Sequence, residues 1–527
     1  MTTRGNNTID IQSATPKNLR ELLESRANAT PEKLFLFSES DGRRYTYSEF
    51  DAAVNRTVRL LAAHGLSKGD KVSLLMPNSA EYIIAYFACF KMGALAGPLN
   101  SLLKSPEMAY VMANSESKAL IVDTEFLPKI ESIREQLPAL NAVIVFDDEI
   151  ESTKNYSDDG EPLPVLPIET TDEAIIIYTS GTTGKPKGCL LTHGNLLANA
   201  RQISSWLGFT EKDRLLTVMP LFHMNAVSVT TMTPLYAGGS SVVSPKFSVS
   251  RFWQIISDYK VTSFGSVATM LALLLEKYPD GVPPGLKTER LRFAMCGSAP
   301  VPAEVMKRFE ETFKCLVIEG YGLSESTCRS TFNPPDTRRR PGSCGMPIGN
   351  EMMIVDEADN EVANGSLGEI VLRGENILKG YYKNPQADEQ AFRNGWFHTG
   401  DVAYKDDDGF YYIVDRKSDM IIRGGENIYP REIDEALYQH PAVAAAATIG
   451  IPDDLYGEEV SAFVVLKNGE ATTEEDLLAH CRQQLADYKC PKTIHIVAEI
   501  PKGPTGKLLK RELAKLFRKE VSTPPDR

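Results

Sequence analysis

The stretch at residues 178–188, YTSGTTGKPKG, constrains this chain more than any other part of the sequence. It follows the apolar run at residues 174–177, which predicts a buried strand. Glycine lets backbone N–H groups approach an anion, the hydroxyl groups donate hydrogen bonds, and Lys185 and Lys187 add positive charge. The pattern therefore predicts a loop that holds polyphosphate at the end of a strand. The alternative is a flexible surface turn, because glycine, serine and threonine are ordinary loop residues.

This loop differs from the Walker loop of P-loop nucleotidases. A Walker loop has Ser or Thr after its Gly-Lys pair and runs straight into a helix. Here Gly184 and Lys185 are followed by Pro186 and then by the apolar segment at residues 189–191. The sequence therefore argues against a P-loop kinase or GTPase.

Composition indicates a large globular protein. A chain of 527 residues is long enough for about three or four domain units, or for one large domain and a smaller one. Hydrophobic residues make up 42% of it and charged residues 24%, which argues against extensive disorder. The net charge of -13 disfavours nucleic acid as a partner.

The sequence predicts a cytoplasmic protein without a membrane span. Its apolar stretches are interrupted before they reach the roughly 18 residues that a spanning helix needs, and its polar start does not resemble a secretory signal. Eight cysteines occur without a CxxC pair, which disfavours a zinc site or a disulfide framework. We expect most of them to be small buried hydrophobic residues.

The order of expected helices and strands predicts an α/β fold. Strands are expected at residues 45–47, 72–76 and 143–146, with Ser48 as the N-cap of a helix through Leu61 and a further helix at residues 81–92. Thr192 is expected to cap a helix through Ile203, and further strands are expected at residues 215–219, 241–243, 291–295 and 316–318. Beyond Arg339 the short strands and turns are typical of a β-rich subdomain. We predict a large N-terminal domain of α/β sheets plus the β-rich subdomain (1–417) and a small, mobile α+β C-terminal domain (418–527).

Seven motifs, in the same order, resemble those of the adenylate-forming superfamily, which includes acyl- and aryl-CoA synthetases, firefly-type luciferases and peptide-synthetase adenylation domains. The resemblance extends from about residue 19 to residue 513. The motifs are YTSGTTGKPKG at Tyr178, MPLFHMN at Met219, GSAP at Gly297, YGLSES at Tyr321, GWFHTGD at Gly395, DRKSD at Asp415 and PTGK at Pro504. One of them alone would be a weak indication, but all seven together make a chance match improbable.

The resemblance implies an ATP-dependent acyl-CoA synthetase. Such enzymes join a carboxylate to ATP, release pyrophosphate, and pass the acyl group from the adenylate to a thiol. Attack of a carboxylate on the α-phosphate brings anions together, so hydrogen-bond donors, lysines and Mg²⁺ must neutralise them. The implied co-substrates are ATP, coenzyme A and a small-molecule carboxylic acid.

The resemblance also implies which residues bind ATP or AMP. Glu325 is expected to hold Mg²⁺, Tyr321 to stack on adenine, and Asp401 to accept both ribose hydroxyls with help from Arg416. Lys507 is expected to bridge the attacking carboxylate and the α-phosphate as a mobile point charge. The remaining expected ATP or AMP residues are Thr179, Ser180, Gly181, Thr182, Thr183, Gly184, Lys187, Gly297, Ser298, Ala299, Pro300, Gly320, Gly322 and Ser324.

Further expected roles concern the acyl group and coenzyme A. By the resemblance, His223 gates the acyl tunnel, although a core histidine bonded to a backbone carbonyl is the alternative. Gly424 and Gly425 are expected to line the pantetheine tunnel. The hinge of the family is usually Asp or Lys, and this chain departs from that pattern with Ser418. The expected acyl pocket comprises His223, Met224, Asn225, Val227, Ser228 and Arg329.

The acid itself is not predicted by these motifs. The expected pocket residues are mostly small or apolar, which suits a hydrophobic or medium-sized acyl group. Arg329 is the exception, and it could pair with a second carboxylate or a polar tail on the substrate. An arginine turned to solvent or paired with an internal glutamate is the favoured alternative.

Three functions remain open at this point. The first is the acyl-CoA synthetase, and the second is a stand-alone adenylating enzyme that loads the phosphopantetheine of a carrier protein. A non-catalytic nucleotide-binding relative would be expected to lack Lys507 or Glu325, and both are present. A homodimer is a further possibility.

Overall fold

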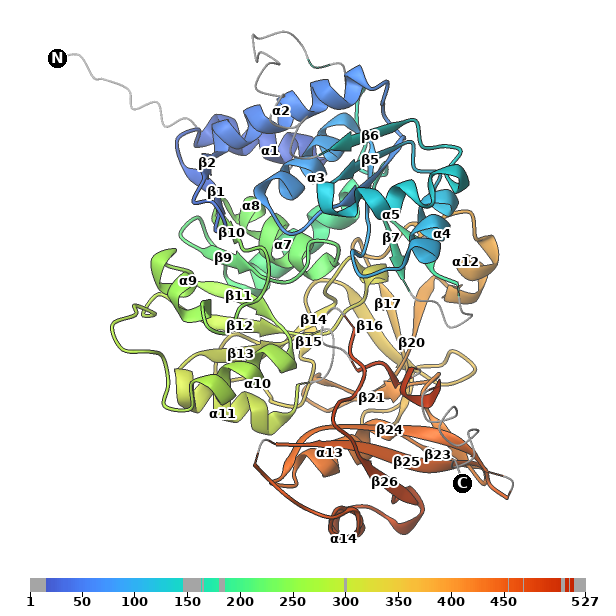
Figure 1. Cartoon of the computed structure of the whole chain (residues 1–527). Coiled ribbons are helices and arrows are strands. Elements are labelled where there is room, and N and C mark those ends of the chain that lie inside the picture. Colours follow the sequence, from blue (N-terminus) through green and yellow to red (C-terminus); the bar gives the residue numbers. More distant parts are fainter. Residues whose placement is uncertain are drawn as a thin grey trace, which may run out of the picture.

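The structure, a computed structural model, describes residues 16–145, 163, 165–179, 185–297, 301–453, 455–467, 469–503, 508–510 and 512–515. A large N-terminal part lies against a smaller C-terminal part, and the chain passes once from one to the other (Figure 1). Two seven-stranded sheets and a five-stranded sheet belong to the larger part, and another five-stranded sheet belongs to the smaller one. These mixed sheets and the helices that cover them confirm the predicted α/β fold class.

The first seven-stranded sheet places three strand ends side by side. Its order is β13-β12-β11-β9-β10-β1-β2, and all neighbouring pairs are parallel except β1 with β2 at the edge. The carboxyl ends of β11, β12 and β13 therefore meet at one edge, where open α/β sheets bind ligands. The strands are β1 (Leu34–Ser38), β2 (Arg44–Thr46), β9 (Arg214–Thr217), β10 (Ser240–Val243), β11 (Ser263–Ser266), β12 (Phe293–Cys296) and β13 (Leu316–Glu319).

The second seven-stranded sheet contains the strand that precedes the glycine-rich loop. Its order is β18-β8-β7-β4-β3-β5-β6, parallel from β7 to β6, with β8 and β18 added in antiparallel fashion. The strands predicted at residues 72–76, 143–146 and 174–177 are confirmed, with bounds that differ by one or two residues. The strands are β3 (Lys71–Leu75), β4 (Leu95–Pro98), β5 (Ala119–Val122), β6 (Ala142–Val145), β7 (Glu173–Thr179), β8 (Lys187–Thr192) and β18 (Gly380–Tyr381).

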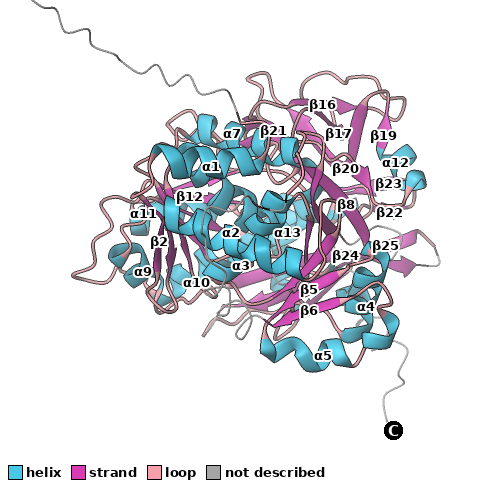
Figure 2. Ribbon diagram, turned by 90° about the horizontal axis from the view of Figure 1, so that it is seen from above, coloured by secondary structure: helices cyan, strands magenta, loops and turns pink. Residues whose placement is uncertain are grey.

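Helices fill the space between these two sheets (Figure 2). Every residue of α3 (Ala80–Met92) is buried, as expected for a helix enclosed by protein on all sides. The predicted cap at Thr192 is confirmed, because its side chain accepts the Asn195 amide at the start of α7 (His193–Leu207). The cap predicted at Ser48 is wrong. Helix α2 (Tyr47–Ala63) begins two residues earlier, because Thr46 and Glu49 form a capping box.

The β-rich texture predicted beyond Arg339 is confirmed. Strands β16 (Glu351–Val355), β17 (Gly368–Arg373), β20 (Trp396–Lys405), β19 (Phe392–Arg393) and β21 (Tyr411–Arg416) form an antiparallel sheet. The positions of Asp401 and Arg416 follow from this sheet, since the two residues are paired across β20 and β21.

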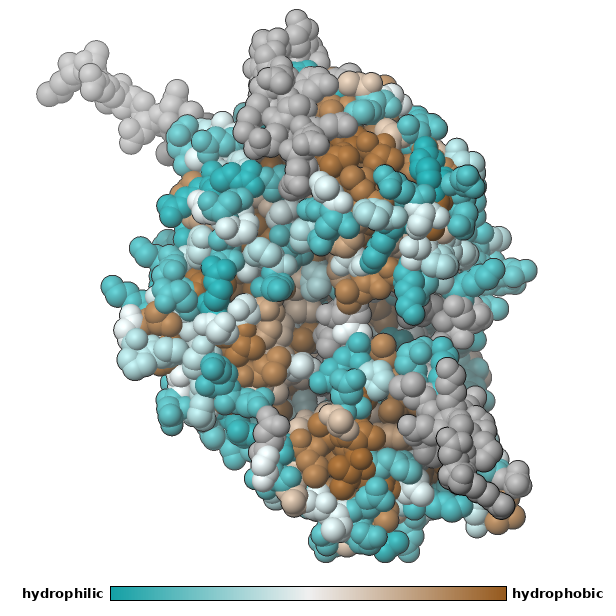
Figure 3. All heavy atoms as spheres, in the orientation of Figure 1, coloured by the Kyte–Doolittle hydropathy of each residue, from teal (hydrophilic) through white to brown (hydrophobic). Residues whose placement is uncertain are grey.

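The C-terminal part has its own sheet and its own core. Strands β22 (Ile421–Arg423), β23 (Glu426–Ile428), β24 (Val443–Asp453), β25 (Gly457–Leu466) and β26 (Thr493–Ile496) pair with one another, and α13 (Pro430–Tyr438) and α14 (Glu474–Gln484) pack on them through Ile433, Leu437 and Leu477. The surface is hollowed between the two parts on the face shown in Figure 3. The boundary proposed between residues 417 and 418 falls in the connection from β21 to β22. That the smaller part moves as an independent domain stays a prediction.

Two expectations from composition can be compared with the structure. Seven of the eight cysteines are buried and Cys490 is partly buried, as expected for small apolar side chains. Within the described part of the chain, no helix combines the length and the apolar character that crossing a bilayer requires.

Candidate active site

The base of the glycine-rich loop brings together side chains from three distant parts of the sequence. Thr179 and Lys187 are paired at the loop end of the β7/β8 hairpin. Thr179 Oγ1 donates a hydrogen bond to Glu325 Oε1 at 3.2 Å, and the Tyr381 hydroxyl donates to the same oxygen at 3.2 Å. Lys187 Nζ lies 5.3 Å from the centre of the Tyr381 ring. A hydroxyl, an ammonium group and a carboxylate therefore meet where the loop begins and ends.

A second polar group forms where β20 and β21 pass the end of β13. The Tyr321 hydroxyl donates to Asp401 Oδ2 at 2.6 Å, and Arg416 Nε lies 2.9 Å from Asp401 Oδ1. Asp401 is 3% exposed, so its charge is compensated by these two partners and not by solvent. The Asp401 carboxylate raises the pKa of Arg416, and burial together with the same carboxylate raises the pKa of Tyr321.

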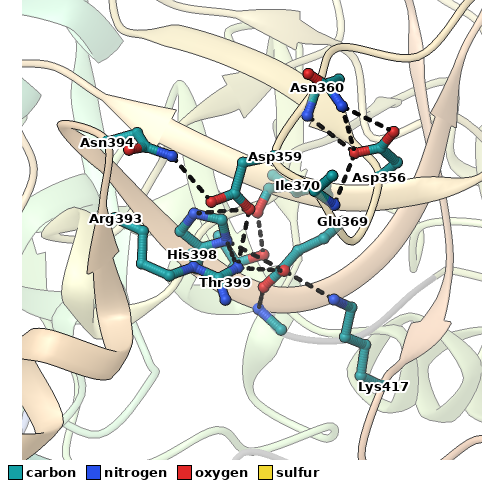
Figure 4. Close-up of polar contacts among 12 residues, drawn as sticks. Asp356, Asp359, Asn360, Glu369, Ile370, Arg393, Asn394, His398, Thr399 and Lys417 are labelled. Carbon is teal, nitrogen blue, oxygen red and sulfur yellow. Dashed lines mark hydrogen bonds and ion pairs between the residues drawn. The ribbon is translucent and has the colours of Figure 1, made fainter.

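The part of β20 that carries Asp401 is held by a cluster around Glu369 (Figure 4). Glu369 accepts the Gly400 amide at 2.9 Å, contacts His398 Nδ1 at 3.1 Å and pairs with Lys417 Nζ at 2.9 Å. Burial acts to raise the pKa of Glu369, but the hydrogen bonds from Lys417, His398 and the Gly400 amide lower it below its usual value. The cluster thus links the part of β20 beside Asp401 to Lys417, the residue before the proposed hinge at Ser418.

All of the expected acyl-pocket residues except Arg329 lie on one segment. Asn225, Val227 and Ser228 belong to a π-helix, η4 (Asn225–Met232), and His223 and Met224 directly precede it. Met224, Asn225, Val227 and Ser228 are buried, and His223 is half-buried. Burial lowers the pKa of His223 to about 4, so its imidazole is neutral at physiological pH. Its Nε2 atom has no hydrogen-bond partner among the described residues, so the expected bond from a core histidine to a carbonyl is not made by that atom.

Arg329 lies in the interior of the protein, so the alternative of an arginine turned to solvent is wrong. Its side chain is 2% exposed, and the described residues provide no ion pair for it. The backbone of Arg329 is held inside the protein by α7, because Asn199 Nδ2 of that helix donates to the Arg329 carbonyl at 2.7 Å. A Cβ atom at Gly297 would lie 2.5 Å from Arg329 Nη1, so the guanidinium occupies the space beside that glycine.

The remaining predicted residues fall into three groups. Gly320, Gly322 and Ser324 lie on the segment that joins β13 to Glu325, which also contains Tyr321. Gly424 and Gly425 form the turn between β22 and β23 with φ of 59° and 90°, and the Ser418 hydroxyl donates to Asp419 Oδ1 at 3.0 Å in an exposed turn. Outside the described residues lie Ser180, Gly181, Thr182, Thr183, Gly184, Ser298, Ala299, Pro300 and Lys507.

The segments that flank Lys507 are held on the C-terminal part. Lys502 and Leu508 form a β-bridge on either side of the PTGK motif. Lys510 Nζ pairs with Asp434 Oδ2 of α13 at 2.9 Å, and Leu513 is buried against the face of the C-terminal sheet that includes Phe463. The chain is thus fixed immediately before and after the motif.

The sequence did not single out two kinds of residue that the structure places at this site. Tyr381 reaches Glu325 because β18 pairs with β8, a contact between residues almost 200 positions apart. Asn199 and Asn376 hold the backbone of Arg329 through their side-chain amides. No motif identifies these residues, because their roles depend on contacts between distant segments.

Comparison with known proteins agrees with this arrangement. A family model described as AMP-binding enzyme matches residues 23–382, which is more than half of the chain, and one described as AMP-binding enzyme C-terminal domain matches residues 432–507. The chain belongs to the family of AMP-binding enzymes. The predicted membership of the adenylate-forming superfamily is therefore confirmed.

Among AMP-binding enzymes, this one is similar to carboxylate–CoA ligases. A sulfoacetate–CoA ligase of Cupriavidus necator is 37% identical over 503 residues, covering 94% of this chain and 97% of the relative. The solved structure of the anthranilate CoA ligase AuaEII in complex with anthranoyl-AMP has a TM-score of 0.88 at 30% identity, covering 96% and 98% of the two chains. ATP-bound MatB from Rhodopseudomonas palustris gives 0.88 at 29% identity over 96% and 100%. The protein is an enzyme of the carboxylate–CoA ligase class, and the acids named for the first two of these relatives differ.

Proposed function

We propose that this enzyme adenylates a carboxylic acid with ATP, releases pyrophosphate, and transfers the acyl group to coenzyme A to give acyl-CoA and AMP. The observation that carries the proposal is the meeting of Thr179, Lys187 and Glu325 at the base of the glycine-rich loop. Phosphoryl chemistry of this kind requires donors and positive charge around the phosphates and a carboxylate for a metal ion. All three groups are present at one point.

Asp401 is proposed to bind the ribose of the nucleotide. An ionised carboxylate has about four lone-pair positions. Tyr321 and Arg416 occupy one position on each oxygen, which leaves two for the two ribose hydroxyls. The two partners also fix the orientation of the carboxylate before the nucleotide arrives, which reduces the entropy cost of binding.

Glu325 is proposed to hold Mg²⁺ together with the phosphates of ATP. Mg²⁺ is usually bound through one or two carboxylates plus substrate phosphates. Glu325 fits this role because it is half-buried, faces Thr179 and has no cationic partner among the ion pairs of the described residues. The described part of the chain contains no group of three or more His, Cys, Asp or Glu side chains arranged for a metal, so a metal held by protein and phosphate together is the simpler arrangement there.

Lys507 and the C-terminal part are proposed to serve the two half-reactions in turn. The bridge between Lys502 and Leu508 holds the described residues on either side of the PTGK motif, and the compact charge of Lys507 would act on the reacting carboxylate and the α-phosphate. Gly424 and Gly425 would line the path of the pantetheine arm after rotation about Ser418.

Strongly exposed apolar side chains on the C-terminal part, such as Leu455 at 78% and Ile422 at 50%, support a second docking orientation that covers them.

Coenzyme A is the proposed acceptor, and the phosphopantetheine of a carrier protein is the second candidate. The similarity to CoA ligases over almost the full length of the chain favours coenzyme A. Incubation of the purified enzyme with ATP, Mg²⁺, coenzyme A and a panel of carboxylic acids should yield AMP, pyrophosphate and an acyl-CoA thioester. Formation of AMP without any CoA thioester, together with acylation of a carrier protein, would instead support the second candidate.

A variant of Lys507 separates the two half-reactions. Lys507→Ala should reduce adenylate formation by roughly 10²-fold or more, because a charge that stabilises the transition state is lost. Transfer from supplied acyl-adenylate to coenzyme A should remain near the wild-type rate. Lys502→Ala is the matched control, since it removes an exposed lysine from the same segment. An equal loss in both half-reactions for Lys507→Ala would refute the assigned role.

A further inference from the structure

Arg329 carries a buried positive charge that the described residues leave without a counter-ion. The only hydrogen bond that its guanidinium makes there is a long one, from Nη1 to the Gly320 carbonyl at 3.4 Å. Nε and Nη2 are buried and have no partner. A buried, unpaired charge costs several kcal/mol, so such a group in a folded protein requires an explanation.

The two free nitrogens form one edge of the guanidinium. Nε–H and Nη2–H lie side by side and point in nearly the same direction, which is the arrangement that binds a carboxylate or a similar oxyanion through two parallel hydrogen bonds. The long bond from Nη1 to Gly320 belongs to the other side of the group. The edge suited to anion binding is therefore the one without a partner.

The backbone of Arg329 is held in place from two directions. Its carbonyl accepts Asn199 Nδ2 at 2.7 Å and Asn376 Nδ2 at 3.4 Å. Asn199 also accepts the Ser228 hydroxyl at 2.9 Å, which connects Arg329 to the π-helix of the expected acyl pocket. The guanidinium lies 5.4 Å from the centre of the Phe332 ring. These contacts fix the position of the charge in the absence of a ligand.

A second unpartnered polar side chain lies at the same sheet edge. Asn225 is 5% exposed, and neither its Oδ1 nor its Nδ2 atom has a partner among the described residues. A Cβ at Gly265 of β11 would lie 2.9 Å from Asn225 Oδ1, as a Cβ at Gly297 would lie 2.5 Å from Arg329 Nη1. Gly265 pairs with Met295 of β12, and Gly297 directly follows that strand, two residues after Met295, so the two glycines are about 8 Å apart.

Glu319, a buried acid that interacts electrostatically with Arg329, does not form an ion pair with it. Glu319 is buried, its Oε1 atom accepts the Val301 amide at 3.2 Å, and its Oε2 atom has no partner in the described chain. The two side chains do not form an ion pair. Burial raises the pKa of Glu319 to about 7, so a large fraction of this group is uncharged at neutral pH.

The closeness of Glu325 and Arg329 in the sequence bears on the size of the acid. Glu325 and Arg329 are separated by four residues, so their Cα atoms lie no more than about 14 Å apart. The chain between them includes a 3-10 turn, η5 (Ser324–Ser326), which shortens this distance further. The proposed metal ligand and the guanidinium thus belong to one short segment, which favours a short acid.

From this arrangement, and resting on the proposed function, we infer that the substrate is a short carboxylic acid with a second anionic group, a carboxylate or a sulfonate, bound by the Nε and Nη2 edge of Arg329. Asn225 Nδ2 donates a further hydrogen bond to the substrate in the same pocket. The unreacted anion supplies the counter-charge that the described residues do not provide.

The first test compares acids of equal length with and without the second anion. The panel contains malonate, succinate and sulfoacetate against propionate and butyrate, with AMP release measured for each. The wild-type enzyme should favour one or more of the dianions by at least about 30-fold in kcat/KM, which corresponds to about 2 kcal/mol at 1.4 kcal/mol per factor of ten. The dianion with the highest kcat/KM then shows whether the site prefers a carboxylate or a sulfonate as the second anionic group. A preference for the monoanions would overturn the inference.

The second test changes the arginine. Arg329→Met should remove the preference by lowering kcat/KM for the dianion at least about 30-fold, while the value for the monoanion of equal length changes less than about threefold. Arg329→Lys keeps the charge but not the paired donors and should give an intermediate loss. Arg339→Met is the matched control, because Arg339 is largely buried and pairs with Glu310 of helix α11 (Ala303–Phe313). Equal losses for both acids in Arg329→Met, or an unchanged preference, would contradict the inference.

Binding without turnover separates this inference from the proposed function. The favoured dianion should raise the melting temperature of the wild-type enzyme and of Arg339→Met, but not that of Arg329→Met, whereas butyrate should have little effect on any of them. If binding follows this pattern and no acid yields AMP, the inference stands and the proposed function fails. If AMP and thioester form but dianions and monoanions behave alike, the proposed function stands and the inference fails.

Discussion

Replacement of Tyr321 by phenylalanine tests the proposed nucleotide site at a single atom. The change removes the hydroxyl that donates to Asp401 at 2.6 Å and leaves the ring in place. Hydrogen bonds to charged groups contribute about 1.5–3 kcal/mol. Because each 1.4 kcal/mol is a factor of ten, loss of this contact should raise KM for ATP by about 10- to 150-fold if it serves binding fully.

The effect should fall on KM for ATP and leave kcat nearly unchanged. The ribose contact is the same in the ground state and in the transition state, so its loss weakens binding uniformly. Initial rates of AMP formation at varied ATP and saturating acid and coenzyme A measure both constants. A fall in kcat with unchanged KM would show that Tyr321 acts at the reacting centre and not through Asp401.

Tyr411→Phe is the matched control for this experiment. The Tyr411 hydroxyl also donates at 2.6 Å and is also buried, but its acceptor is the Met352 carbonyl in the β-rich sheet. Its loss should lower the free energy of unfolding by about 0.5–1.5 kcal/mol and leave KM for ATP unchanged. If both variants raise KM for ATP equally, the effect of Tyr321→Phe is one of general stability and the ribose assignment is refuted.

Two further predictions concern acidic residues. Glu325→Gln should reduce adenylation roughly 10²–10³-fold and raise the Mg²⁺ concentration needed for half-maximal rate, since the carboxylate that faces Thr179 at the loop base is lost; an unchanged Mg²⁺ dependence in a titration would contradict its role. The pKa of Glu319 is about 7 in the folded protein against an ordinary value of 4.5, so the unfolded chain releases this proton first and stability falls as pH rises from about 4.5 to about 7. At 1.36 kcal/mol per pH unit the fall is about 3 kcal/mol, and Glu319→Gln should lack it. Urea unfolding of both proteins at pH 5 and pH 8 measures the difference, and parallel changes in the two would argue against the assigned pKa.

Much of the fold could be predicted because strands of this protein are marked by local pattern. The apolar runs at residues 72–76 and 174–177 form β3 and β7 almost as predicted, and Thr192 caps α7. The start of α2 was missed although Thr46 and Glu49 are three residues apart, because Ser48 offers a competing cap in the same turn. The π-helix at Asn225–Met232 could not be predicted, since its mixture of small, apolar and hydroxyl side chains has no helical period.

At the site, the residues that belong to motifs could be predicted from the sequence, whereas the residues that support them could not. Tyr321, Asp401 and Arg416 belong to three separate motifs, and the structure brings Tyr321 and Arg416 to the two oxygens of the Asp401 carboxylate. Tyr381 could not be predicted because it depends on the pairing of β18 with β8. For Arg329 the sequence left a pocket position, a solvent-exposed position and an internal pairing open, because arginine is mostly exposed on average; its burial, with its backbone held by the amides of Asn199 and Asn376, is known only from the structure.

Acid-dependent exchange of labelled pyrophosphate into ATP, in the absence of coenzyme A, tests the central claim most directly. Reversible adenylation predicts exchange that requires Mg²⁺ and a suitable acid, that needs no thiol, and that is lost in Lys507→Ala. A contradictory result would be formation of ADP and phosphate from ATP, or exchange that occurs only when coenzyme A is present.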